Sequence, residues 1–280
     1  MKNGNEKLKI IFVRATMAQK FQNHRVETQS CKIIFIMKNN LIIKNFYDEL
    51  SNAIGEMKFS APVAVVYNPL QYAADGLEKY LRYSEGSKRV VFLGMNPGPW
   101  GMAQTGVPFG EIKAVKNFLG LNDIKISSPA NEHPLYPVQG LSCTRTEVSG
   151  KRLWGLFKER FGTAEKFFEE HFVLNYCPLL FLTESGENRV RNLTPDKLEK
   201  SERKILYAAC DLCLKKIIEV LKPKFVVAIG NFAEDRALEA LDDLDVTISK
   251  ILHPSPASPQ SNQNWAGTVT SQLIEARIWN

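Results

Sequence analysis

Three polar side chains stand at or just after the ends of apolar runs that predict buried strands. Asn96 ends the first of these runs, Asn175 lies near the end of the second, and His253 follows the last. A carboxamide offers both a hydrogen-bond donor and an acceptor, and histidine often acts as an acid, a base or a donor. The other three histidines lie in the N-terminal segment or away from predicted strand ends, so His253 is the strongest candidate for chemistry.

The elements that would position these residues alternate along the chain. Continuous apolar runs bounded by Pro, Gly or Asn predict buried strands at 89–96, 172–176, 225–229 and 246–252. Helical patterns occur at 45–56, 76–84, 150–161, 194–221 and 232–241. Strands that alternate with helices predict an α/β fold with a parallel sheet covered on both faces. Because ligands bind outside the carboxyl ends of such strands, we expect Asn96, Asn175 and His253 to converge on one cleft.

The segment Met95–Gly110 has the composition of a pocket wall. It holds four Gly and three Pro in 16 residues, carries no charge, and keeps Trp100, Met102 and Phe109. Glycine permits close approach of a ligand to the backbone, and proline fixes the loop in advance. An ordinary buried loop is the alternative. A phosphate-binding loop is disfavoured, because neither Gly-Lys-Ser/Thr nor G-x-G-x-x-G is present.

A second stiff segment, His253–Trp265, contains three Pro and three Ser. It predicts either a surface turn or a finger that inserts into a groove, with His253 at its base.

The positive charge is concentrated at the N-terminus. Residues 1–44 contain nine Lys or Arg and two Glu, whereas the rest contains 27 basic and 28 acidic residues. We therefore expect a basic, disordered tail over 1–44 and a folded domain over 45–280. If the domain binds nucleic acid, it must do so through local patches.

The cysteines and the hydropathy exclude several classes of protein. Five cysteines without a disulfide spacing indicate a reducing compartment, and Cys210 and Cys213 read as core residues rather than zinc ligands. No apolar stretch reaches the ~18 residues that would predict a membrane span.

Two motifs carry a resemblance to a known family. Gly94–Glu111 resembles the first motif of the single-strand-selective monofunctional uracil-DNA glycosylases, and His253–Pro256 with Pro259–Asn262 resembles the second. Three shorter segments also match: Glu147–Gly150, Asn175–Leu182 and Asn192–Pro195. The resemblance runs from about residue 46 to the end. It implies a single three-layer α/β/α domain around a four-stranded parallel sheet. It also implies a monomer that acts on DNA without a metal or a cofactor.

The resemblance also implies an activity. Uracil, or a 5-substituted uracil such as 5-hydroxymethyluracil, would be flipped from single- or double-stranded DNA and cut from its sugar without strand cleavage. Asn96 would position the attacking water, and His253 would donate to the charge that develops on O2. Phe109 would stack on the base, and Asn175 would pair with N3–H and O4.

The implied substrate-binding set also includes Met95 and Gly98, of which Gly98 leaves room at C5 of the base. The implied DNA-binding residues lie in two loops: Ser185, Arg189, Arg191 and Asn192 in the first, and Pro254, Ser255, Pro256, Ala257, Ser258, Pro259, Gln260 and Asn262 in the second. The second loop would fill the gap left by the flipped base. Ala257 stands where Arg is common in the family, which removes a charge there.

Two other functions stay open from the sequence. One is a mispair-directed glycosylase for thymine or ethenocytosine, against which Asn175 and Phe109 argue. The other is a non-catalytic module that binds damaged DNA, whose expected mark is loss of Asn96 or His253. We expect a nuclear protein, with mitochondrial targeting by the basic tail as the alternative.

Overall fold

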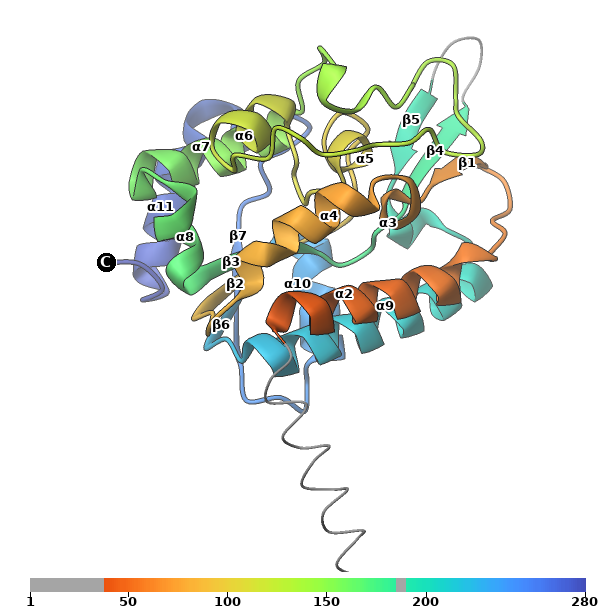
Figure 1. Ribbon diagram of the computed structural model, residues 1–280. Coiled ribbons are helices and arrows are strands. Elements are labelled where there is room, and N and C mark those ends of the chain that lie inside the picture. Colours follow the sequence, from red (N-terminus) through yellow and green to blue (C-terminus); the bar gives the residue numbers. More distant parts are fainter. Residues whose placement is uncertain (1–37, 185–189) are drawn as a thin grey trace, which may run out of the picture.

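A four-stranded parallel sheet forms the centre of the computed structural model, which describes residues 38–184 and 190–280 (Figure 1). The strand order is β3 (His171–Asn175), β2 (Val90–Gly94), β6 (Phe225–Ile229) and β7 (Thr247–Ile251). All three neighbouring pairs are parallel. This is the predicted sheet, and the predicted bounds differ from the observed ones by at most two residues at an end.

Helices cover both faces of this sheet and complete three layers. Figure 1 shows α2, α9 and α10 on one side and α7, α8 and α11 on the other. The strands β2 and β6 are buried along their whole length, which is why they read as continuous apolar runs. The helices are α2 (Asn39–Gly55), α3 (Pro69–Tyr72), α4 (Ala74–Leu81), α5 (Met102–Thr105), α6 (Ile112–Asn117), α7 (Val148–Phe161), α8 (Ala164–Glu170), α9 (Lys200–Leu221), α10 (Asn231–Ala240) and α11 (Ser261–Glu275).

The long helix α9 starts later than the sequence predicts. Thr194-Pro195 has the pattern of a helix start, but Pro195 opens only a short 3₁₀ turn, and the side chain of Glu199 caps the helix before Lys200. Cys210 and Cys213 lie buried on the inner face of α9, as predicted for core cysteines. The helix ends at Leu221, and the next residue, Lys222, has a left-handed φ of 48°.

A second, antiparallel sheet was not predicted. Its strands are β1 (Val63–Tyr67), β4 (Leu180–Glu184) and β5 (Val190–Leu193), in the order β1-β4-β5. More than a hundred residues separate β1 from β4, so the sequence between them has no hairpin spacing that would predict their pairing. This sheet matters for the site because β4 follows β3 directly and carries the chain past the end of the parallel sheet.

The folded part begins earlier than residue 45. Helix α2 starts at Asn39, whose carboxamide donates to the backbone oxygens of Ser84 at 3.0 Å and Gly86 at 3.1 Å. Residues 39–44, which the charge pattern places in the tail, therefore belong to the domain. The rest of the predicted tail, residues 1–37, lies outside the described residues.

Candidate active site

The carboxyl ends of the four parallel strands lie along one edge, and the three predicted residues lie there. Asn175 is the last residue of β3 and pairs in register with Gly94, the last residue of β2. Asn96 follows two residues after β2, and His253 two residues after β7. Neighbouring strands in a sheet are about 4.8 Å apart. Residues distant in the sequence therefore share one edge, as the strand pattern predicted.

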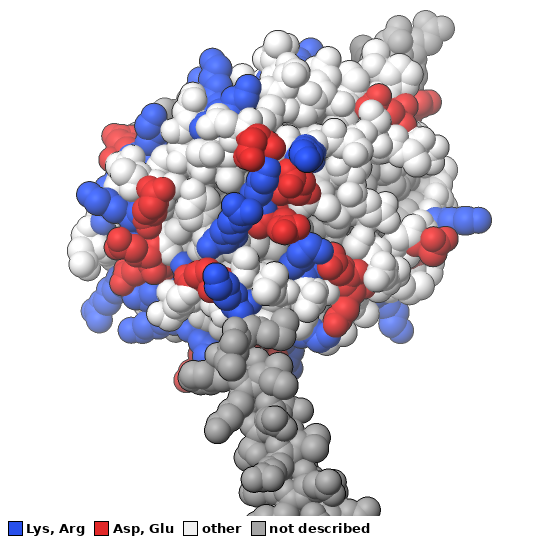
Figure 2. All heavy atoms as spheres, in the orientation of Figure 1, with Lys and Arg blue, Asp and Glu red and all other residues white. Residues whose placement is uncertain are grey.

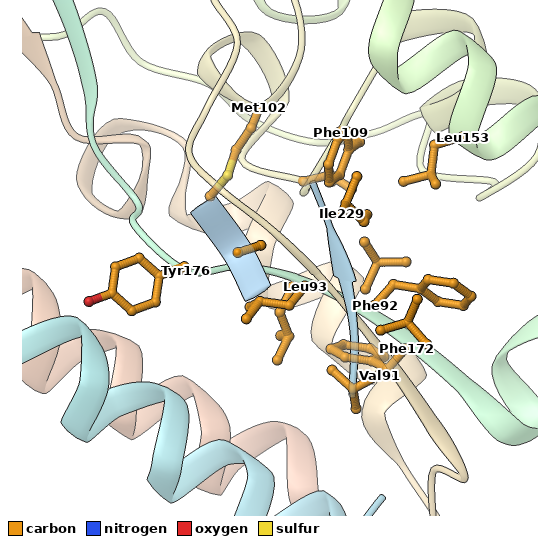
Figure 3. Packing of buried hydrophobic residues seen from close by; sticks show 14 of the residues in the cluster. Val91, Phe92, Leu93, Met102, Phe109, Leu153, Phe172, Tyr176 and Ile229 are labelled. Atoms are coloured by element: carbon orange, nitrogen blue, oxygen red, sulfur yellow. The ribbon is translucent and has the colours of Figure 1, made fainter. Parts of the chain in front are cut away.

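Asn175 and Phe109 lie together over the end of β2. A side-chain carbon added at Gly94 would be 2.4 Å from Asn175 Oδ1 and 2.4 Å from the ring of Phe109. Gly94 is therefore required for their close approach. Figure 3 shows Met102 and Phe109 towards one end of the core, with Phe92 and Val91 deeper along the strand.

The carboxamide of Asn175 has unused hydrogen-bonding capacity at both ends. Its side chain is only 8% exposed, yet Oδ1 has no partner among the described residues. Its Nδ2 contacts only the sulfur of Met102, at 3.3 Å. A buried polar group without a partner costs about 1–3 kcal/mol, so this amide is arranged to receive a ligand with one donor and one acceptor.

Hydrogen bonds tie the loop Met95–Gly110 to the rest of the protein. Asn96 Nδ2 donates to the Leu179 oxygen at 3.1 Å, which orients the carboxamide. The buried Gln104 donates to the oxygens of Pro99 and Pro137, both at 3.0 Å. These contacts agree with the expectation that this segment forms a preformed pocket wall.

Phe109 is held in a strained backbone conformation. Its φ is 53°, in the left-handed region that residues other than glycine rarely adopt. Trp154 Nε1 donates to the Phe109 oxygen at 3.1 Å and holds the residue in place. Strain of this kind persists where the surroundings fix it, and it concentrates at functional sites.

His253 is a neutral imidazole with a defined tautomer. Its half-buried ring accepts the Ser255 backbone N–H at Nδ1, at 3.1 Å, so Nε2 carries the proton and is a donor. Burial lowers the pKa of His253 to about 4. Gly230 brings the end of β6 against this ring, since a carbon added there would lie 3.3 Å from the ring atom Cδ2 of His253.

The segment after His253 is a braced turn, the Pro254–Gln260 loop. Helix α11 takes in the rest of the predicted segment from Ser261, but its backbone is not helical at Asn264, where φ is −132° and ψ is 66°. Arg152 of α7 donates to the Pro254 oxygen at 2.8 Å and to Asn262 Oδ1 at 3.0 Å. The tip of the loop is exposed at Pro256, Ala257, Pro259 and Gln260.

The first predicted DNA-binding loop is described only in part. Ser185 and Arg189 lie outside the described residues. Arg191 and Asn192 lie on β5, where Arg191 is exposed, and Asn192 Nδ2 donates to the Pro97 oxygen at 3.3 Å. The structure therefore joins β5 directly to the loop that carries Asn96.

Two residues of this region have contacts that the sequence does not assign to them. Met102 supplies the sulfur beside Asn175, and Glu147 places a carboxyl group against Gly98 and Gly101. Glu147 is visible in the sequence only as part of a matching motif. Nothing in the local sequence shows that its carboxyl would be turned inward.

One cavity lies away from these three residues. It has a volume of about 930 Å³ between β1 and the end of α2, and neither Asn96, Asn175 nor His253 lines it.

Across residues 38–184 and 190–280, no three His, Cys, Asp or Glu side chains are placed to hold a metal ion. None of the helices in these ranges has the length and hydrophobicity that crossing a bilayer requires.

Comparisons with known proteins agree with this architecture. Residues 82–273 match the uracil DNA glycosylase superfamily. The chain is 45% identical over 229 residues to the single-strand selective monofunctional uracil DNA glycosylase of Bos taurus, covering 81% of this chain and 82% of that protein. The corresponding protein of Rattus norvegicus is 46% identical over 229 residues, 81% of each chain. The crystal structure of wild-type SMUG2 from Pedobacter heparinus shares the fold, with a TM-score of 0.57, 17% identity, and coverage of 84% of this chain and 99% of that one.

Proposed function

This chain belongs to the uracil DNA glycosylase superfamily and, within it, to the single-strand-selective monofunctional enzymes, and on that premise we propose that it excises uracil-type bases from DNA. It hydrolyses the bond between base and sugar and leaves the strand uncut. One observation carries the proposal for this site. The buried carboxamide oxygen of Asn175 has no hydrogen-bond partner among the described residues, and it lies beside the strained Phe109.

Base recognition follows from these two side chains. The amide of Asn175 accepts from uracil N3–H and donates to O4, which satisfies both of its free ends. Cytosine presents the reverse pattern and would leave two polar groups unpaired, at a cost of about 1–3 kcal/mol each. Phe109 stacks on the ring, a contact worth about 1–3 kcal/mol.

Cleavage requires stabilisation of the departing base. His253, with its proton on Nε2, donates to the charge that develops on O2, and such a preorganised donor contributes about 3 kcal/mol. Asn96, oriented by the Leu179 carbonyl, holds the attacking water. An amide is not a base near neutral pH, so the water attacks late, after the bond to the sugar has largely broken.

DNA binding is proposed for the two loops that border the edge. The Pro254–Gln260 loop fills the gap in the stack, while Arg191 and Asn192 of β5 contact the backbone beside it. The loop's bracing by Arg152 supports this role, because a rigid wedge loses little entropy on insertion. We extend the proposed substrates to 5-substituted uracils, and we propose the nucleus as the compartment, the latter on sequence grounds alone.

The test uses oligonucleotides that carry one uracil, followed by alkali to break abasic sites. We expect the wild-type protein to give breaks, and Asn96→Ala and His253→Ala to lower the single-turnover rate by about 100-fold or more. Asn122→Ala, an exposed asparagine in the segment after α6, is the matched control and should retain full activity. Binding without breaks would establish the non-catalytic alternative, and faster release of mispaired thymine than of uracil would establish the mispair-directed one.

A further inference from the structure

The carboxyl group of Glu147 fills space beside the loop that carries Asn96. Glu147 precedes α7, but its side chain does not cap that helix. A carbon added at Gly98 would lie 2.6 Å from Glu147 Oε1, and one added at Gly101 would lie 2.1 Å from Oε2. The carboxyl therefore occupies the volume that side chains at these two glycines would need.

The same carboxyl adjoins the residues proposed to bind the base. A carbon added at Gly150, in the first turn of α7, would lie 2.8 Å from Glu147 Oε2 and 2.1 Å from the Phe109 oxygen. The ring of Phe109 in turn meets Asn175 over Gly94. A continuous set of neighbours thus leads from Asn175 through Phe109 to Glu147.

No hydrogen bond explains the position of the inner oxygen of Glu147. This atom, Oε2, is buried and makes no hydrogen bond within residues 38–184 and 190–280. Burial raises the pKa of Glu147 to about 7, and the nearby Glu111 carboxylate adds to the rise, against a smaller opposing effect of the Gly150 amide. Near neutral pH the group is partly protonated, so it can donate as well as accept a hydrogen bond.

The edges of the base leave one position for this group. In the complex that rests on the proposed function, Asn175 takes N3 and O4, His253 takes O2, and Phe109 covers a face. The C5 edge, next to O4, remains. The Pro97–Gly101 loop is left to face it, and there the Glu147 carboxyl lies in the space that a side chain on Gly98 would take.

We infer that Glu147 selects the substituent at C5: its carboxyl takes the place of a side chain at position 98 and forms a hydrogen bond with a small polar group on the flipped pyrimidine. A hydroxymethyl group can make this bond. The methyl group of thymine cannot, and it would leave the buried carboxyl without a partner.

The first experiment compares single-turnover release of uracil, 5-hydroxymethyluracil and thymine by the wild type, Glu147→Ala and Glu147→Gln. We expect the ratio of kcat/KM for 5-hydroxymethyluracil to that for uracil to fall about tenfold in Glu147→Ala, the size of one hydrogen bond. Glu147→Gln keeps a donor and an acceptor and should restore much of the ratio. Glu159→Gln, an exposed residue on the same helix, should leave it unchanged.

An unchanged ratio in a folded Glu147→Ala protein overturns the inference, and thermal unfolding of each variant establishes folding. If Glu147→Ala fails to fold, the ratio in Glu147→Gln against that in Glu147→Asp, which withdraws the carboxyl by one methylene, decides in the same way. Failure of the wild type to release uracil at all would instead overturn the proposed function.

A second experiment tests the shared volume directly. Gly98→Ala places a carbon where Glu147 Oε1 lies, so we expect slower release of uracil. Removing the carboxyl in the double variant Gly98→Ala/Glu147→Ala should make it faster than Gly98→Ala alone. A double variant whose loss equals the product of the two single losses would show that the two residues do not compete for that space.

Discussion

At the scale of single residues, the charge state of His253 sets the acid side of the pH profile. Its pKa is lowered to about 4 because burial penalises the charged ring, and Nδ1 is engaged by the Ser255 N–H. A second proton would displace that hydrogen bond and disturb the start of the Pro254–Gln260 loop.

We therefore expect the single-turnover rate to stay level from about pH 6 to about pH 5 and to fall only below that, whereas an exposed histidine would titrate near 6.5. The measurement is the rate of uracil release across this range. An acid limb with a midpoint near 6.5 would show that the ring is charged much earlier than its burial allows.

Glu147 sets the alkaline side. Its pKa is raised to about 7, so the neutral form dominates below that pH and the carboxylate above it. The departing base is an anion, so a negative charge on Glu147 would oppose its departure. The nearby Glu111 already disfavours that charge. We expect the rate to decline as pH rises above about 7 and the decline to disappear in Glu147→Gln. A decline that survives in Glu147→Gln would assign it to another group.

The sequence anticipated some of these residues and missed others for physical reasons. Asn96, Asn175 and His253 could be placed together because each stands at the end of a strand, and parallel strands end at one edge. Glu147 could not be placed there, since an acidic residue before a helix is normally interpreted as a helix cap or as a partner of the helix dipole. Its inward position depends on Gly98 and Gly101, which lie in a distant segment of the chain, as well as on the neighbouring Gly150.

At the scale of elements, Arg152 couples α7 to the Pro254–Gln260 loop. Its two hydrogen bonds reach the first residue of the loop and the first turn of α11, so one guanidinium holds both ends. The parallel sheet was predictable because buried strands leave a clear apolar pattern. The β1-β4-β5 sheet was not, since its pairing joins distant segments.

We expect Arg152→Ala to raise KM for duplex substrate several-fold more than for single-stranded substrate, because only the duplex requires a wedge between stacked bases. Lys151→Ala, the exposed neighbour on α7, is the matched control. Steady-state kinetics on both substrates make the comparison, and equal changes on the two would remove the loop from duplex opening.

At the scale of the whole molecule, charge is divided between tail and domain. Figure 2 shows Lys and Arg interspersed with Asp and Glu over the visible face of the domain. Residues 1–37 alone contain seven Lys or Arg and two Glu. A basic segment next to a nearly neutral domain suits attachment to DNA that does not depend on its sequence.

We expect deletion of residues 1–37 to weaken DNA binding and to flatten its salt dependence, by about 0.9 in the logarithmic slope for each phosphate that the basic segment neutralises. The rate at saturating protein should not change. Binding titrations at several salt concentrations test this, and identical slopes for both proteins would separate the tail from DNA attachment.

The last residues of the chain close the core at the edge of the sheet opposite the site. Trp279 Nε1 donates to the buried His171 Nε2 at 3.1 Å, and Arg89 donates to the Ile278 oxygen at 2.6 Å. During synthesis this corner stays open until residues 278 and 279 have left the ribosome. The core is therefore completed only after that point. A purification tag fused directly after residue 280 would sit beside that closing corner.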